Sequence, residues 1–291
     1  MSVTLGADVL ARYERFTLYN SPYPAHGEGR AVDLYPATGA PSPVTGEIIE
    51  ARTVAAPTRP YAVDHDHLIV VDTGEYLVRI LHVDPGVKPG EQVTVGDNLG
   101  ELVRSGYFAP WVDNHLHVGF RPPGSDPVRA SGSLQIELDI EIEALTWDGT
   151  GEVVETGDTY ALLDSPSHPA PGKRFAGIAA GFGDGGANLA VLDGGLPHYD
   201  GGGLLYARVQ EAAPGVDSYE GPVTLAGTEV GHSHGRDVTW DEMTVLANGR
   251  PITGLSLFCA RDAGFGVKLI CPDETFEIDD RVTVEIRTNR S

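Results

Sequence analysis

Glycine and proline interrupt this sequence from end to end and leave room only for short regular segments. The 291 residues include 37 glycines and 21 prolines. Between them recur short runs rich in valine, isoleucine, leucine, threonine and tyrosine, whereas helical periodicity is scarce. Such a pattern is typical of short strands joined by turns, so we predict an all-β protein.

The clearest strand patterns occur in both halves of the chain. In the first half we expect strands near 12–18, 46–54, 67–72, 76–83, 98–104 and 115–121, with one short helical turn within 1–11. In the second half we expect them near 134–145, 159–163, 175–180, 189–192, 204–209, 239–247, 255–260, 266–271 and 281–287. Segment 134–145 alternates strictly between apolar and polar residues, which indicates one half-buried strand with a carboxylate-rich face.

A proline-rich stretch separates the two halves. Residues 122–127 read Pro-Pro-Gly-Ser-Asp-Pro and can hardly hold a sheet ladder, because proline lacks the N–H that the ladder needs. We therefore predict an N-terminal domain over 1–122, a linker over 123–132 and a C-terminal β-sandwich-like domain over 133–291. The chain length suits two ordinary domains.

The chain is strongly acidic, with 20 basic and 42 acidic residues and a formal net charge of −22. This charge argues against nucleic acid or an anionic membrane as a partner, because it repels phosphate. Only three basic residues are lysines, which is typical of halophilic proteins, although an ordinary acidic protein fits the same numbers. No apolar run is long enough to span a membrane, and the N-terminus lacks a signal-peptide pattern, so we expect a cytoplasmic protein.

The motif Asn-His-Leu-His-Val-Gly-Phe at 114–120 carries the first chemical signal. In a strand, residues i and i+2 share a face, so His115 and His117 would project side by side while Leu116 and Val118 enter a core. Two imidazoles in this arrangement can bind a metal, or one can bind while the other transfers protons. Two exposed or hydrogen-bonded histidines remain the alternative.

Two further motifs precede this strand. The first runs from His26 through Gly-Glu-Gly-Arg-Ala-Val to Asp33, and Pro-Val-Thr-Gly-Glu-Ile follows it at 43–48. The second is Ile-Leu-His ending at His82, followed by a segment with the spacing Gly-x-x-Val-x-x-Gly-x-x-Leu-Gly that ends at Gly100. Together with His-Leu-His, this order over residues of about 20–122 resembles the M23 family of zinc metallopeptidases, the lysostaphin and LytM type.

The resemblance implies an antiparallel β-sandwich and a zinc ion, one per chain, bound by His26, Asp33 and His117. Three protein ligands and one water form the open arrangement that zinc catalysis requires. His82 and His115 would then be catalytic auxiliaries that orient the water, accept its proton and stabilise the oxyanion. The implied reaction is hydrolysis of peptide bonds, with a peptide or peptide-containing molecule as the substrate.

One spacing departs from the family pattern. The family normally has three residues between its first His and Asp, but here six lie between His26 and Asp33, and the position four before Asp33 is Gly29. The glycines at 27 and 29 permit a looped path that returns His26 to the site. The alternative is a catalytically inactive M23-like binding or scaffolding protein, in which His26 faces solvent.

A second His-x-His lies in the C-terminal half, at His232 and His234. Glycines flank it on both sides, so we expect a flexible loop that could form only a weak accessory metal site.

Overall fold

The computed structural model describes residues 2–129, 131–183, 186, 188–205, 218–262 and 264–288. The chain divides into two compact units. The first unit comprises Met1–Phe16 and Gly29–Ile140, and the second comprises Thr17–Glu28 and Glu141–Ser291. The expected linker 123–132 thus lies inside the first unit, and beyond it the chain remains in the first unit as far as Ile140.

Strand pairing explains this position. Strand β11 (Gln135–Asp139) pairs in parallel with β1 (Ser2–Gly6), so the chain beyond the prolines still belongs to the first unit. The next strand, β12 (Ile142–Leu145), pairs in parallel with β15 (Phe175–Phe182) of the second unit. The alternating segment 134–145 is therefore two strands with different partners, not the single strand that we predicted.

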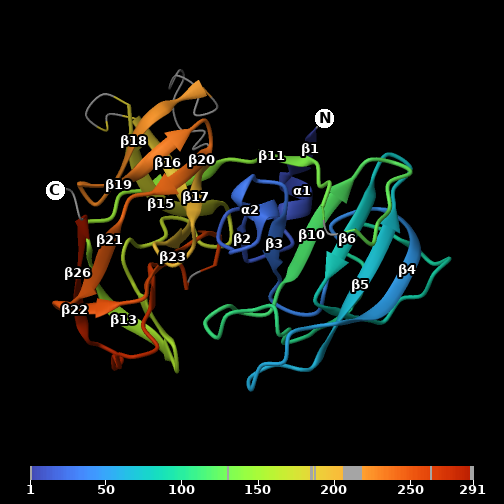
Figure 1. Ribbon diagram of the computed structural model, residues 1–291, viewed down its shortest axis with the longest axis horizontal. Helices are drawn as coiled ribbons and strands as arrows, with labels where there is room; N and C mark the ends of the chain where they lie inside the picture. Colours follow the sequence, from blue (N-terminus) through green and yellow to red (C-terminus); the bar gives the residue numbers. More distant parts are fainter. Residues whose placement is uncertain are drawn as a thin grey trace. The chain divides into compact units, whose positions relative to one another are not determined.

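The first unit is built almost entirely of strands. It holds β1, α1 (Ala7–Leu10), β3 (Val32–Tyr35), β4 (Gly46–Ala55), β5 (His65–Asp72), β6 (Leu77–Leu81), β7 (Val83–Pro85), β8 (Gln92–Val93), β9 (Gly100–Leu102), β10 (Leu116–Arg121) and β11. Its main sheet is antiparallel in the order β3–β10–β6–β5–β4–β8. Figure 1 shows β10, β6, β5 and β4 side by side, and β7 pairs separately with β9.

Apolar side chains hold this sheet together. Leu116, Val118 and Phe120 alternate along β10 and are buried, as the His-Leu-His pattern predicts for one face of the strand. Ile80 of β6 and Ile69 of β5, which are directly opposite each other in the register, are also fully buried. Burying such a side chain contributes about 1.5–3 kcal/mol. The resulting core fixes the register of β10 against β3 and β6.

The second unit is also built of strands. It holds α2 (Pro24–Gly27), β12, β13 (Thr150–Gly157), β14 (Tyr160–Leu163), β15, β16 (Asn188–Leu196), β17 (Gly201–Leu205), β18 (Glu220–Leu225), β19 (Thr228–His234), β20 (Asp237–Trp240), β21 (Met243–Ala247), β22 (Arg250–Ile252), β23 (Gly254–Leu257), β24 (Cys259–Ala260), β25 (Lys268–Ile270) and β26 (Arg281–Thr288). Strand β2 (Arg15–Thr17) runs across the division between the units.

Pairing in the second unit returns to its starting strand. The antiparallel pairs run β15–β16–β17–β20–β19–β18 and close with a β18–β15 contact between Thr224 and Gly181. A further series leads from β16 through β23, β25, β14, β13, β26 and β21 to β22. One cluster of buried apolar side chains, including Phe182, Leu192 and Leu257, fills this unit.

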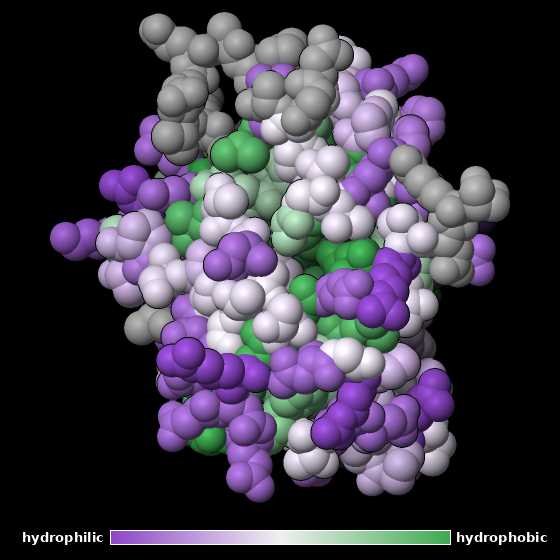
Figure 2. All heavy atoms as spheres, turned by 90° about the vertical axis from the view of Figure 1, so that its left-hand side faces the viewer, coloured by the Kyte–Doolittle hydropathy of each residue, from purple (hydrophilic) through white to green (hydrophobic). Residues whose placement is uncertain are grey.

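The all-β prediction is confirmed by both units. Most expected strands are present within a few residues, although positions 206–209 of the strand expected at 204–209 lie outside the described residues. Across the described part of the chain, no helix is long and apolar enough to cross a membrane. On the face drawn in Figure 2, hydrophilic side chains cover much of the surface and hydrophobic ones show between them.

Candidate functional site

Strand register brings Asp33 and His117 together. On β10, His117 is directly opposite Asp33 of β3 on one side and Leu81 of β6 on the other. Directly opposite residues of antiparallel strands project from the same face, so the two side chains meet. His117 Nδ1 lies 2.9 Å from Asp33 Oδ1, and the Asp33 carboxylate is buried. Residues far apart in the sequence thus form one polar pair across β3 and β10.

His115, the residue directly before β10, contacts the same carboxylate. Its Nε2 lies 3.4 Å from Asp33 Oδ2, so His115 and His117 do project from one face. Its Nδ1 lies 2.8 Å from the carbonyl oxygen of Asp113, and because a carbonyl only accepts, Nδ1 carries the hydrogen. The ring packs against Phe108 and Tyr35, with centroid distances of 4.4 and 4.9 Å.

Burial decides the charge of His115. Desolvation lowers the pKa of its imidazole to about 4, and the attraction of Asp33 only partly opposes this shift. The ring is therefore neutral at neutral pH, and its Nε2 presents a lone pair toward Asp33 Oδ2. Two acceptor atoms facing each other favour a cation or a proton near them. This pair of atoms is an observation in favour of a cation site at Asp33.

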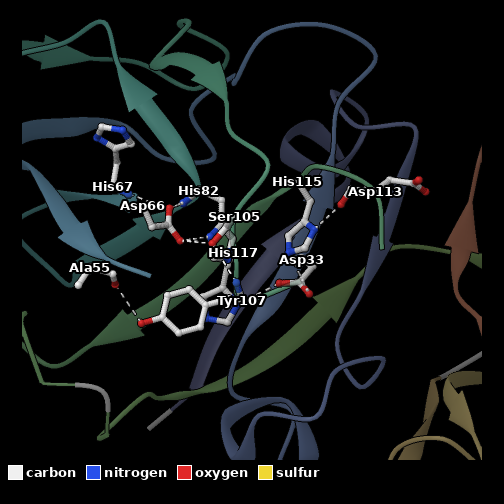
Figure 3. A network of polar contacts seen from close by, with 10 residues as sticks. All are labelled: Asp33, Ala55, Asp66, His67, His82, Ser105, Tyr107, Asp113, His115 and His117. Atoms are coloured by element: carbon white, nitrogen blue, oxygen red, sulfur yellow. Dashed lines mark hydrogen bonds and ion pairs between the residues drawn. The ribbon is translucent and has the colours of Figure 1, made fainter. Parts of the chain in front are cut away.

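His82 follows directly after β6 and completes a group of three imidazoles. Its ring centroid lies 5.3 Å from that of His115 and 5.9 Å from that of His117. Its backbone has φ 70°, a left-handed conformation that is uncommon outside glycine. Figure 3 shows His82, His115 and His117 near Asp33, all within the first unit.

Asp66 of β5 is the residue of this region that sequence reasoning did not identify. Its buried carboxylate lies 2.6 Å from Nδ1 of His82 and accepts a hydrogen bond from Ser105 Oγ at 2.7 Å. Burial raises its pKa, but the hydrogen bonds from His82 and Ser105 outweigh burial and hold the pKa below the usual value. The available signal was an acidic residue inside a strand that is otherwise buried.

His26, the third predicted ligand, belongs to the segment Thr17–Glu28 of the second unit. It lies in the short helix α2 and is fully buried, not facing solvent as the inactive alternative expects. Its Nδ1 lies 2.7 Å from the carbonyl oxygen of Leu18, which requires a hydrogen on Nδ1 and leaves the lone pair on Nε2. Gly29 has φ 62°, the left-handed conformation that a looped path after His26 needs.

The expected loop at His232 and His234 is wrong, because both residues lie in strand β19. A Cβ on Gly231 would overlap the carbonyl oxygen of Thr239, so this glycine permits close strand pairing and does not indicate flexibility. His232 does lie near two carboxylates, 3.9 Å from each of Glu229 and Asp241. These three residues form a partly exposed group with metal-ligand chemistry.

Two models of one protein family match this chain. Residues 4–138 match the N-terminal domain, and residues 143–287 the C-terminal domain, of a family described as a domain of unknown function (DUF8155). A search of curated proteins finds no match.

Two solved structures are similar to part of the chain. The catalytic domain of the antimicrobial peptidase lysostaphin from Staphylococcus simulans, crystallised in the absence of phosphate, is 23% identical, with a TM-score of 0.29. That alignment covers 43% of this chain and 92% of the lysostaphin domain. The structure of LytU is 25% identical over 42% of this chain and 82% of LytU, also with a TM-score of 0.29. Each alignment therefore concerns less than half of the chain.

Proposed function

This chain belongs to the DUF8155 family, and we propose that it is a zinc-dependent hydrolase of peptide bonds. One observation carries the proposal: a buried carboxylate, Asp33, lies between His117 and His115 at 2.9 and 3.4 Å. The ring of His82 lies beside both imidazoles. Candidate metal ligands next to histidines that can transfer protons are a composition that suits metal-assisted hydrolysis.

The proposed zinc ligands are His26, Asp33 and His117. Two imidazoles and one carboxylate form a donor set that zinc accepts in open catalytic sites, where water takes the fourth position. The hydrogen bond of His26 Nδ1 to a backbone carbonyl is the outer contact that fixes the tautomer of a metal-ligating histidine. When bound, zinc supplies Lewis acidity that brings the pKa of a coordinated water to about 7.

His82 and His115 are the residues that we assign to proton transfer and orientation. His82 has its Nδ1 committed to Asp66, so its Nε2 is the atom that takes a proton from water and returns it to the leaving amine nitrogen. His115 has its Nδ1 committed to Asp113, so its Nε2 accepts a hydrogen bond and orients the water. The His115 ring stays neutral, so stabilisation of the oxyanion falls to His82, whose Nε2 can donate a hydrogen bond once it has taken the proton from water.

The substrate that we propose is a peptide or a peptide-containing molecule. The net charge of −22 disfavours nucleic acid and anionic membrane surfaces as partners. A cytoplasmic location and adaptation to high salt are further parts of the proposal.

Metal analysis of the purified full chain tests the ligand set. Protein prepared in high-salt buffer without added zinc should contain close to one zinc per chain, measured by mass spectrometry of the metal. Asp33→Ala and His117→Ala should lose it, because each removes a proposed ligand. His232→Ala is the matched control, since it removes a histidine from the group with Glu229 and Asp241, and it should keep the zinc. Wild-type protein that stays metal-free after zinc reconstitution would falsify the proposed site.

Turnover separates the enzyme from the inactive alternative. Zinc-loaded protein should cleave a quenched-fluorescence peptide library that includes glycine-rich sequences, and chelation should stop the cleavage. Stoichiometric zinc without any cleavage would support a binding or scaffolding protein instead.

A further inference from the structure

The buried carboxylate of Asp66 makes four hydrogen bonds, and two of them are to His82. Its Oδ1 accepts the backbone N–H groups of His67 at 2.7 Å and of His82 at 3.0 Å. Its Oδ2 lies 2.6 Å from Nδ1 of the His82 ring and 2.7 Å from Oγ of Ser105. One carboxylate therefore holds both the main chain and the imidazole of His82 (Figure 3).

We propose that Asp66 is a positioning residue for His82, which it keeps in the tautomer with hydrogen on Nδ1 and a lone pair on Nε2. An ionised carboxylate can only accept, so the imidazole nitrogen that faces it must donate. The role of this tautomer in proton transfer rests on the proposed function, whereas the tautomer itself does not. A carboxylate that orients a histidine in this way also stabilises the imidazolium that forms during proton transfer.

The backbone of His82 shows why this support is needed. The left-handed φ of 70° costs an ordinary residue roughly 1–2 kcal/mol. The hydrogen bond from the backbone N–H of His82 to Asp66 helps to hold this conformation. At the same point the ring of Phe108 packs edge-on against the imidazole, with a centroid distance of 4.6 Å. The direction of the imidazole is thus determined by contacts on two sides.

Ser105 donates its hydrogen bond to the carboxylate of Asp66 and not to the imidazole of His82. Its hydroxyl donates to Oδ2 of Asp66, and its oxygen accepts the backbone N–H of Tyr107 at 3.2 Å. The serine, aspartate and histidine therefore do not form the order of a serine hydrolase, in which the hydroxyl contacts the imidazole. Ser105 supplies a further donor to a buried charge that needs several.

Asp66→Asn gives a sharp test, because the donors around this position are fixed. The two backbone N–H groups can only donate, so the amide oxygen must face them and the amide NH₂ must take the place of Oδ2. Nδ1 of His82 must then accept, and its hydrogen must move to Nε2. Histidine-labelled full chain, free of metal, should show by ¹⁵N–¹H correlation spectroscopy a protonated Nδ1 in the wild type and a protonated Nε2 in Asp66→Asn. The His82→Asn spectrum assigns the signal.

Ser105→Ala is the matched control. It removes one partner of Asp66 but leaves the carboxylate an acceptor, so the tautomer of His82 should stay as in the wild type. A protonated Nδ1 in Asp66→Asn, or a protonated Nε2 in the wild type, would overturn the proposal.

The catalytic consequence is measured separately on zinc-loaded protein. Asp66→Asn should keep one zinc per chain and a wild-type KM, but its kcat should fall by about 10³–10⁴, the cost of a wrong tautomer in a comparable dyad. Loss of zinc from Asp66→Asn, or an unchanged kcat, would contradict the positioning role. Failure of the wild type to bind zinc or cleave peptides would reject the proposed function and leave the tautomer result standing.

Discussion

His82 has a strained backbone and a proposed role in proton transfer. A useful substitution removes the imidazole without increasing the backbone strain. Alanine at φ 70° would add strain, whereas asparagine tolerates this conformation and can still donate to Asp66. We therefore expect His82→Asn to fold and to keep one zinc per chain. Without the ring nitrogen, peptide hydrolysis should fall by about 10²–10⁴, the usual contribution of general acid–base catalysis.

His65→Asn is the control for this substitution, because His65 is a partly exposed histidine of the neighbouring strand β5, and its ring contacts Asp64 and His67. It should keep both zinc and hydrolysis, as measured by metal analysis and the peptide assay. Loss of zinc in His82→Asn would mean that His82 is a ligand and that its role has been assigned wrongly.

The site residues differ in how much the sequence reveals about them. His115 and His117 were predictable as neighbours on one face, because the two-residue period of a strand is a local property. The meeting of Asp33 with His117 depends on register, which the order of motifs suggested only through a family resemblance. Asp66 gave no such signal. Its role depends on the positions of the His82 and Ser105 side chains, which lie 16 and 39 residues further along the chain.

At the level of elements, β10 carries the site because it lies between β3 and β6. Its alternation predicted which residues enter the core, and the glycine and proline pattern predicted an all-β chain. These patterns did not predict which strands pair with each other. The uniform alternation of 134–145 covers two strands, since alternation indicates which face is buried but not which strand pairs with it. For β19, flanking glycines indicated close pairing instead of a loop.

A buried carboxylate of β16 binds the beginning of the segment that carries His26. Asp193 accepts hydrogen bonds from the Thr17 hydroxyl and from the backbone N–H groups of Leu18 and Tyr19, the latter two at 2.6 and 3.1 Å. Burial raises the pKa of Asp193 from 3.8 to about 6, even though these hydrogen bonds lower it. Burial thus disfavours the charged form of Asp193, even though three hydrogen-bond donors face it.

This shift predicts a pH dependence of stability with a definite sign. The folded chain binds the Asp193 proton more tightly than the unfolded chain does. Protonation of Asp193 therefore stabilises the fold fully below pH 3.8, and this stabilisation is lost as the pH rises through about 6. The loss is on the order of 3 kcal/mol, at 1.36 kcal/mol per pKa unit. Asp193→Asn cannot show this loss. Between about pH 4 and 7 the free energy of unfolding of the variant should therefore rise relative to that of the wild type.

Urea unfolding of metal-free protein, followed by tryptophan fluorescence across this pH range, measures the difference. Asp200→Asn removes an exposed carboxylate from the same unit and is the control for a change of one charge. A difference between wild type and Asp193→Asn that is constant with pH would show that the carboxyl of Asp193 has an ordinary affinity for protons in the folded chain.

On the scale of the whole molecule, composition limits the conditions under which the site works. A net charge of −22 over 291 residues makes the folded chain repel itself at low ionic strength. Unfolding separates these charges, so repulsion lowers the free energy of unfolding. Salt screens the repulsion, since the Debye length falls from about 10 Å at 0.1 M to about 3 Å at 1 M. Salt screens buried interactions much less, so the contact between the buried Asp66 and His82 side chains should persist at high salt concentration.

We therefore expect the melting temperature to rise steadily with KCl from about 0.1 M to about 3 M, with most of the rise below about 1 M, where the Debye length changes most. Differential scanning fluorimetry of metal-free protein measures it. Sucrose is the control, because it stabilises by exclusion from the surface without screening charge. Screening predicts that KCl stabilises this chain well before sucrose does at equal concentration. A melting temperature that is indifferent to KCl would mean that the acidic residues are already balanced by local partners, and the halophilic interpretation of the composition would fail.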